Sequence, residues 1–258
     1  MEESKRKKVG LALGGGVVRG MAHLGVLAVL EQAGIPIDFV SGTSAGSIIG
    51  ATYCAGVSIE TIKKYSLKLR WWHVARPVWP TDGFVSFAPL RRWLAVKIGD
   101  LDFADLKIPF VVVATDLESG RPVRLDRGCL GKAVQASCAV PGLIRPVKMD
   151  GRMLADGSLS DTVPASILRE MGADYVIGVD IFSPAIRRWL GPLGMGIAAL
   201  EILIERAGGG IDQADCLIAP RLAGKTYVRF SKRDELYDLG VQAAREKIPE
   251  IKFALGLD

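Results

Sequence analysis

The stretch Gly42-Thr43-Ser44-Ala45-Gly46 comes just after a mostly apolar run at residues 37–40. A serine between two such glycines is typical of a sharp strand-to-helix turn, which strains the backbone of the central residue and leaves its hydroxyl clear of the sheet. Larger side chains at Gly42 and Gly46 would collide with the neighbouring strand and helix. The motif therefore predicts a nucleophile at Ser44, although a pattern of this length also occurs by chance.

The rest of the chain alternates between strand and helix patterns, and several strands are apolar throughout. Both features are typical of a mainly parallel sheet covered on both faces, so we predict a single α/β domain over residues 1–258. The predicted strands lie at residues 9–13, 37–41, 110–114, 122–125, 144–149, 152–155, 175–181, 217–219 and 227–230. The predicted helices lie at residues 20–33, 45–55, 130–137, 164–171 and 193–204, with a polar helix from Asp234.

The histidines do not fit an ordinary catalytic triad. The chain has only His23 and His73, and an α/β-hydrolase places its histidine late in the sequence, after the acid. Unless His73 serves, the simplest base for Ser44 is a carboxylate within hydrogen-bond distance. Asp150-Gly151 has the spacing of a two-residue hairpin turn. Asp156-Gly157 instead ends the second strand of that hairpin, so Asp156 is the better candidate for the base.

A run of glycines, Gly14 to Gly16, lies between a predicted strand and the start of a helix. Unpaired backbone N–H groups there favour negative charge and would stabilise the oxyanion of an acyl-transfer reaction. A dinucleotide site is the alternative, but Arg19 stands where the third glycine of Gly-x-Gly-x-x-Gly is needed. Gly224-Lys225-Thr226 resembles the end of a P-loop, but Ala219 replaces the first glycine of that motif, so we discard this interpretation.

Three blocks in this order resemble the signature of the patatin-like phospholipase family: Gly14-Gly15-Gly16-Val17-Val18-Arg19-Gly20, Gly42-Thr43-Ser44-Ala45-Gly46 and Asp156-Gly157. The segment Ser137-Cys138-Ala139-Val140-Pro141-Gly142 is similar to the family's segment before the catalytic aspartate. The resemblance implies a three-layer α/β/α lipid acyl hydrolase without calcium, another metal or a cofactor. In it, Ser44 would be the nucleophile and Asp156 the base. The oxyanion hole would be formed by Gly14, Gly15, Gly16 and Val17, and the supporting loop residues would be Arg19, Gly20, Gly42, Gly46 and Gly157.

Two residues depart from the family's pattern. Val17 stands where another glycine is usual, and a β-branched residue tolerates a positive φ poorly. The sequence therefore does not fix the backbone path of the oxyanion loop at Val17. Ser158 stands where a glycine or alanine is common. Among the neighbours, we expect His23 to pack in an apolar helix, Arg19 to brace the glycine loop, and Cys138 to lie in the core.

Positive charge is concentrated at residues 60–98, which contain eight Lys or Arg and only two acidic residues, Glu60 and Asp82. The net charge of this segment is +6, and that of the remainder of the chain is −1. Basic side chains mixed with tryptophan suit an anionic lipid interface. The alternative is a cap packed on the body, with its tryptophans buried. This cap-like segment contains four of the five tryptophans in the chain, namely Trp71, Trp72, Trp79 and Trp93.

The cysteines and the apolar runs indicate where in the cell the protein is expected. Cys54, Cys129, Cys138 and Cys216 lie far apart without a Cys-x-x-Cys pair, so we expect reduced, buried thiols in a cytoplasmic protein. No apolar run reaches the ~18 residues that a spanning helix needs, so any membrane contact would be peripheral, at the inner membrane surface. We expect a lipid or acyl ester as the substrate and no nucleic-acid partner.

The sequence therefore predicts a serine acyl hydrolase with a Ser–Asp dyad that cleaves acyl esters of phospholipids or lysophospholipids through an acyl-enzyme. Two alternatives stay open. One is a soluble carboxylesterase or thioesterase that never meets a bilayer. The other is a catalytically silent relative that binds lipid or protein, which the departure at Val17 leaves open.

Overall fold

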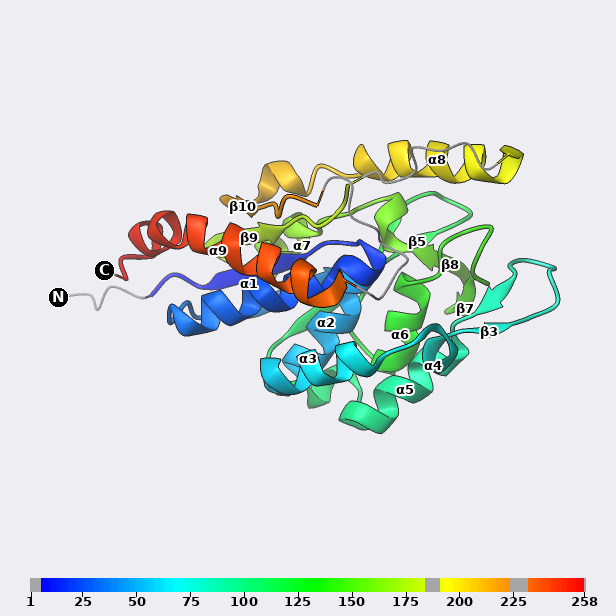
Figure 1. The fold of residues 1–258 in the computed structure, drawn as a ribbon, viewed down its shortest axis with the longest axis horizontal. Coiled ribbons are helices and arrows are strands. Elements are labelled where there is room, and N and C mark those ends of the chain that lie inside the picture. The colour runs from blue at the N-terminus through cyan, green and yellow to red at the C-terminus, as the bar shows by residue number, and fades with distance from the viewer. Residues whose placement is uncertain (1–5, 184–190, 223–231, 258) are drawn as a thin grey trace.

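The computed structural model describes residues 6–183, 191–222 and 232–257, and an eight-stranded sheet lies at its centre (Figure 1). The strand order is β10-β9-β1-β2-β5-β8-β7, and β6 also pairs with β5. The strands are β1 (Val9–Leu13), β2 (Phe39–Thr43), β5 (Phe110–Asp116), β6 (Pro122–Leu125), β7 (Val147–Met149), β8 (Arg152–Asp156), β9 (Tyr175–Val179) and β10 (Cys216–Ile218). The pairs from β10 to β5 are parallel, whereas β6, β7 and β8 add antiparallel pairs. This confirms the predicted mainly parallel sheet.

Helices cover both faces of this sheet, as predicted. In β1, Leu11 and Leu13 face the larger core cluster, whereas Ala12 faces a smaller cluster with Leu168. The larger cluster joins the sheet to α1 (Met21–Gln32), α2 (Ala45–Cys54), α6 (Leu130–Ser137) and α9 (Arg233–Leu255). On the other face lies the short helix α7 (Ala165–Glu170). The remaining helical elements of the body are η1 (Val17–Gly20), η2 (Phe103–Asp105), η3 (Gly157–Leu159), η4 (Ile211–Gln213) and α8 (Gly191–Glu205).

The basic, tryptophan-rich segment contains α3 (Ile59–Lys68), α4 (Trp71–Val74), the hairpin strands β3 (Arg76–Pro77) and β4 (Val85–Ser86), and α5 (Ala88–Ile98). Its tryptophans divide into two groups. Trp71 and Trp93 pack against the core, whereas Trp72 and Trp79 are 73% and 82% exposed. Two tryptophans of this segment therefore pack on the body and two lie at the surface.

Some boundaries differ from the sequence prediction. Strand β2 begins two residues late, after Asp38, whose side chain accepts the Val9 N–H, and it runs to Thr43 because that residue still pairs with Val113 of β5. Strand β7 begins only at Val147, after Pro146, which has no N–H to donate. The helix α8, predicted at residues 193–204, begins at Gly191 and ends at Glu205, and it exposes the apolar side chains of Ile202 and Leu203. The predicted strand at residues 227–230 and the discarded P-loop match at 224–226 lie outside the described residues.

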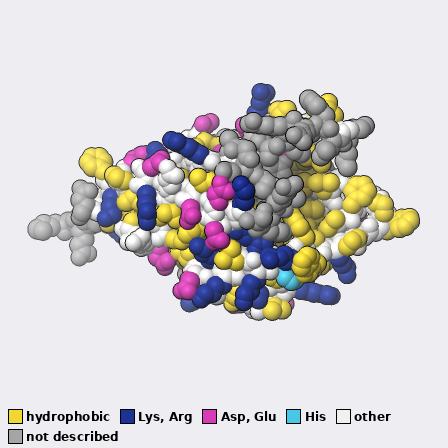
Figure 2. Space-filling model, in the orientation of Figure 1, with side chains coloured by type: hydrophobic (Ala, Val, Ile, Leu, Met, Phe, Trp, Pro, Cys, Tyr) yellow, Lys and Arg dark blue, Asp and Glu magenta, His cyan; other side chains and the backbone are white. Residues whose placement is uncertain are grey.

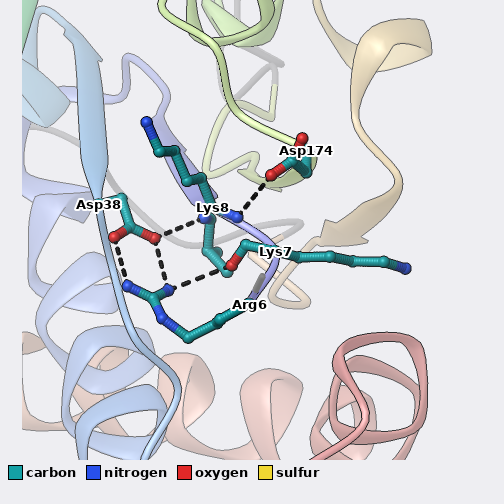
Figure 3. A network of polar contacts seen from close by, with 6 residues as sticks. Arg6, Lys7, Lys8, Asp38 and Asp174 are labelled. Carbon is teal, nitrogen blue, oxygen red and sulfur yellow. Dashed lines mark hydrogen bonds and ion pairs between the residues drawn. The ribbon is translucent and has the colours of Figure 1, made fainter. Parts of the chain in front are cut away.

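Two carboxylates hold the amino ends of β1, β2 and β9 in line (Figure 3). Asp38, just before β2, binds the Arg6 guanidinium at 2.7 and 2.8 Å and the Val9 N–H at 2.7 Å. The Arg6 guanidinium holds the pKa of Asp38 below its usual value. Asp174, just before β9, accepts the Lys8 N–H at 2.8 Å. Because these strands are parallel, alignment at one end also sets where their carboxyl ends stop.

Helices α1 and α9 lie side by side across the sheet and approach closely at two glycines (Figure 1). A Cβ on Gly25 would lie 2.1 Å from the Tyr237 carbonyl oxygen, and one on Gly240 would lie 2.1 Å from the Ala22 carbonyl oxygen. Both neighbours are helix backbone, which cannot yield as a flexible side chain can. The carboxy-terminal helix is therefore seated on α1 by the absence of side chains at this crossing.

We expect Gly25→Ala to lower the free energy of unfolding by about 1 to 3 kcal/mol, since the helices must move apart to admit the methyl group. Chemical denaturation followed by circular dichroism measures this change. Gly196→Ala is the matched control, because Gly196 lies in α8 with nothing near its Cβ position. That control should be neutral or slightly stabilising. Equal stability of Gly25→Ala and the wild type would contradict the close helix crossing.

Candidate active site

Ser44 occupies a strained turn between β2 and α2. Its φ of 50° and ψ of −116° lie outside the regions that a side chain favours. A Cβ on Gly42 would lie 2.8 Å from the Gly46 carbonyl group, and one on Gly46 would lie 2.0 Å from the Leu13 carbonyl oxygen. The collisions expected from the sequence are therefore present in the structure. The strained turn holds Ser44 at the carboxyl end of the sheet, 6% exposed.

The pairing of β5 brings the ends of β2 and β8 together. On one edge of β5, Val113 pairs with Thr43, the last residue of β2, and the next residue, Ala114, pairs with Asp156, the last residue of β8. Strand β6 pairs with the same two β5 residues, so it occupies the opposite edge. Strands β2 and β8 therefore run toward each other along a single edge, and Ser44 follows directly where they meet.

Gly157 makes this meeting of strand ends sterically feasible. A Cβ at this position would lie 2.3 Å from the Val113 carbonyl oxygen and 3.0 Å from Thr43 Cγ2. The Asp-Gly pair is therefore not a hairpin turn here. The turn is at Asp150-Gly151, where φ is positive at both residues, as expected from the sequence.

The last residue of α6 and the segment that follows it connect the two strand ends through hydrogen bonds. The Ser44 N–H donates to Ser137 Oγ at 2.8 Å, and the Ser137 hydroxyl donates to the Val113 carbonyl at 2.6 Å. The Asp156 N–H donates to the Ala139 carbonyl at 2.9 Å. One short segment thus fixes the backbone of both candidate catalytic residues, a role for Ser137 that the sequence did not reveal.

Asp156 is buried, and the Ser44 side chain is close enough to influence the pKa of its carboxyl. Burial raises the pKa of the Asp156 carboxyl to about 6, and hydrogen bonds from the Ser158 N–H, the Ser44 side chain and the Ser158 side chain oppose that rise. The Ser158 N–H lies 2.9 Å from Asp156 Oδ1. With a pKa near 6, the carboxyl is ionised at neutral pH and can accept the serine proton.

In the glycine loop, Gly14 and Gly15 use their amides inside the fold. The Gly14 N–H donates to the Val179 carbonyl at 3.0 Å, and the Gly15 N–H donates to the Thr162 carbonyl at 3.2 Å. These two amides tie the loop to β9 and to the chain after η3. Of the four residues expected to form an oxyanion hole, Gly14 and Gly15 are therefore the least able to donate an N–H to an oxyanion.

Gly16 and Val17 differ in this respect. Across residues 6–183, 191–222 and 232–257, neither N–H has a hydrogen-bond acceptor, and both residues border an apolar cavity next to Ser44. Val17 has a φ of 51°, the left-handed conformation that suits glycine. A β-branched residue there costs about 1 to 2 kcal/mol, so the loop keeps the left-handed path at the expense of strain.

Arg19 and His23 hold the glycine loop from below. The fully buried Arg19 guanidinium donates to the carbonyls of Ser183 and Leu222, and Glu201 provides a nearby negative charge. His23 Nε2 donates to the Gly14 carbonyl at 2.8 Å. Burial lowers the pKa of His23 to about 4, so this buried ring is neutral at pH 7.

The remaining candidates for nucleophile or base have structural roles. The exposed His73 accepts the Arg70 N–H through Nδ1 at the start of α4. The Cys138 thiol donates to the Ser44 carbonyl at 3.4 Å, and burial raises the pKa of this thiol. A protonated thiol is a poor nucleophile, so these contacts support Ser44 as the reactive residue.

A second buried carboxyl lies five residues beyond Asp156. Burial raises the pKa of Asp161 to about 6, and its Oδ1 finds no hydrogen-bond partner among the described residues. No motif in the sequence singles out this residue. The described residues contain no cluster of three His, Cys, Asp or Glu side chains suited to a metal ion.

The chain matches the family model described as patatin-like phospholipase over residues 11–169. It is 28% identical to lysophospholipase nte1 of Aspergillus fumigatus over 95% of this chain and 18% of that protein. It is 35% identical to an uncharacterized NTE family protein of Mycobacterium tuberculosis, over 69% of this chain and 50% of the relative. The chain therefore spans half or less of the length of these curated relatives.

Two solved structures share the fold at low sequence identity. VipD from Legionella pneumophila aligns with 97% of this chain and 67% of its own length, with a TM-score of 0.59 and 15% identity. The type III effector protein ExoU aligns with 95% of this chain and 53% of its own length, with a TM-score of 0.51 and 14% identity. At such identities the likeness concerns the arrangement of strands and helices.

Proposed function

Because the chain belongs to the patatin-like phospholipase family of lipid acyl hydrolases, we propose that it cleaves acyl esters of phospholipids or lysophospholipids through a dyad of Ser44 and Asp156. The observation that carries the proposal is the meeting of β2 and β8 on β5, which places the Ser44 hydroxyl beside a buried carboxylate whose pKa it lowers. No imidazole lies between them among the described residues, since His23 binds the Gly14 carbonyl and His73 is exposed.

In the proposed reaction, Asp156 accepts the Ser44 proton while the serine oxygen attacks the ester carbonyl. The N–H groups of Gly16 and Val17 would bind the resulting oxyanion, at about 3 to 4 kcal/mol for a well-placed donor. The ester C–O bond then breaks, and Asp156 returns the proton to the leaving oxygen. Water activated by the same carboxylate releases the fatty acid from the acyl-enzyme.

Exposed aromatic side chains support contact with a lipid surface. Trp72, on α4, and Trp79 and Phe84, on the β3–β4 hairpin, are exposed. The hairpin lies at the end of the molecule where hydrophobic side chains gather in Figure 2. The base of this hairpin joins the wall of the cavities next to Ser44. The Phe84 N–H donates to the Leu143 carbonyl at 2.9 Å, and the Arg145 N–H donates to the Val85 carbonyl at 2.8 Å.

The charge of the same segment favours anionic lipid. Lys68, Arg76 and Arg92 form no ion pair with another described residue, unlike Lys64, which pairs with Glu60 at 2.7 Å. We therefore propose that the hairpin and α4 bind an anionic membrane surface peripherally. No described helix has the length and apolar character needed to cross a bilayer. All four cysteines are free, which suits the reducing cytoplasm proposed as the compartment.

We expect Ser44→Ala and Asp156→Asn each to reduce hydrolysis of a nitrophenyl ester by about a thousandfold or more, because each removes a group that acts in the chemical step. Neither change alters core volume, so the melting temperature should stay close to that of the wild type. Asp161→Asn is the matched control, because it neutralises another buried carboxyl of similar pKa and should keep the activity. Near-normal turnover in Asp156→Asn would refute the dyad.

A fluorophosphonate probe separates the hydrolase from a catalytically silent relative. We expect the wild type to be labelled at Ser44 and Ser44→Ala to remain unlabelled, as shown by mass spectrometry of the labelled peptide. Folded wild-type protein that resists labelling would favour the silent relative, which the strained Val17 keeps open.

The pH profile should report the Asp156 carboxyl. Since the base must be ionised, kcat/KM should rise with pH through about 6, the pKa raised by burial. Ser158→Ala removes a side-chain hydrogen bond that lowers this pKa, so the rise should move to higher pH. Ser160→Ala is the control, because that hydroxyl contacts Thr115 instead. A shift to lower pH in Ser158→Ala, or none, would contradict the assignment.

Binding to lipid vesicles tests the proposed surface. Trp79→Ala combined with Phe84→Ala should weaken cosedimentation with vesicles that contain phosphatidylglycerol by about tenfold, because two exposed aromatic anchors are lost. Phe253→Ala is the matched control, since Phe253 is 81% exposed on α9, near the carboxy-terminal end of the chain. Equal loss in both variants, or none in the double variant, would show that the hairpin is not the lipid-binding surface.

A further inference from the structure

Two apolar cavities meet at Ser44. Cavity A has a volume of about 130 Å³ and cavity B about 240 Å³. The wall that they share is formed by Val17, Ser44, Trp71, Val140 and Ile144. A substrate whose ester carbonyl lies at Ser44 can therefore extend its two ends into different cavities.

Cavity A runs from Ser44 between α2 and the helices of the cap-like segment. Its wall is apolar, with side chains that include Met21, Ile48, Leu69, Val74, Phe87 and Leu90. The far end reaches Arg233, whose guanidinium donates to carbonyls at the end of α3, including those of Ser66 and Leu69. Such a wall suits an alkyl chain, since burying apolar surface is favourable and no carboxylate lines the cavity.

Cavity B contains the carboxyl that acts as base in the proposed dyad. Asp156 and Ser158 lie in its wall and are absent from that of cavity A. The other side chains are mainly apolar and include Leu143, Leu159, Phe182, Ile197, Leu200 and Ile204. The remaining charged side chains in the wall are Arg19 and Glu201, which attract each other.

The path of the proton indicates which end of the substrate each cavity holds. During acylation the Ser44 O–H bond and the ester C–O bond break, while a bond forms between the serine oxygen and the acyl carbon. The proton passes from Ser44 to Asp156 and then to the leaving oxygen, which must therefore lie within hydrogen-bond distance of that carboxyl. Because Asp156 borders cavity B alone, the leaving group belongs in cavity B and the acyl chain in cavity A.

We propose that cavity A holds the acyl chain and cavity B an apolar leaving group, so that the preferred substrates carry an alkyl chain on both sides of the cleaved ester. This inference rests on the proposed hydrolase function and deepens it. A leaving group made only of a polar headgroup would lose water against the apolar wall of cavity B without gaining hydrogen bonds, which is costly. Diacyl lipids therefore fit the site better than their lyso forms.

The experiment uses ester pairs in mixed micelles of one neutral detergent. The acyl pair is nitrophenyl laurate and nitrophenyl butyrate, and the alcohol pair is dodecyl butyrate and ethyl butyrate. For each pair the ratio of kcat/KM, long to short, is the measured quantity. In the wild type both ratios should be about tenfold or more, since several methylene groups gain an apolar pocket. Dioleoyl phosphatidylcholine should likewise be cleaved faster than oleoyl lysophosphatidylcholine.

Variants that fill one cavity should change one ratio. Leu69→Trp narrows cavity A and should lower the acyl ratio about tenfold while changing the alcohol ratio less than about twofold. Leu200→Trp narrows cavity B and should have the opposite selectivity. Both leucines are partly exposed, which favours tolerance of the larger side chain. Ile48→Phe and Ile197→Phe, in cavities A and B, are smaller changes that replace any tryptophan variant whose melting temperature falls.

The outcomes separate this inference from the proposed function. Reversed selectivity, equal changes in both ratios, or faster cleavage of the lyso form would overturn the cavity assignment while the hydrolase itself stands. A wild type that cleaves none of these esters would overturn the proposed function, and this inference with it.

Discussion

Strand β5 pairs through Val113 with the end of β2 and through Ala114 with the end of β8, and both partners lie on the same edge. Because a buried backbone must satisfy its N–H and C=O groups, this pairing fixes where each strand stops. A shift of β8 by one residue would turn Asp156 to the opposite face of the sheet. Ser44 would then lose its carboxylate. The hydrogen-bond ladder of β5 is thus the constraint that brings these two distant residues together.

The same pairing buries the Asp156 carboxyl, which disfavours its charged form and raises its pKa. A buried carboxylate with no cation beside it would normally stay protonated at neutral pH, and burial does raise the pKa of Asp156 to about 6. Hydrogen bonds from Ser158 and Ser44 oppose the rise, so the group is ionised at pH 7 yet remains a stronger base than a solvated aspartate. The strained backbone at Ser44 and Val17 persists because the surrounding sheet and helices hold it.

The local backbone geometry of the site could be predicted from the sequence, whereas its long-range geometry could not. Gly42 and Gly46 mark the turn because their environment excludes a side chain, and Asp150-Gly151 marks a hairpin through its spacing. The register that brings β8 against β5 depends on pairing between segments about forty residues apart, which no local pattern encodes. For the same reason the sequence could not show that the amides of Gly14 and Gly15 are used inside the fold.

The residues proposed for ester cleavage and those proposed to select the leaving group lie in different parts of the chain. The elbow, the glycine loop and Asp156 all lie within residues 11–169, the part that matches the family model. Phe182, Ile197, Leu200 and Ile204, which line cavity B, all lie beyond it. A wall built by Phe182, after β9, and by α8 can change without moving Ser44 or Asp156, because β5, the end of α6 and Ala139 fix both. If the proposed assignment holds, chains that share Ser44 and Asp156 can differ in the leaving group they accept, because the residues proposed for ester cleavage and those proposed to select the lipid lie in different parts of the fold.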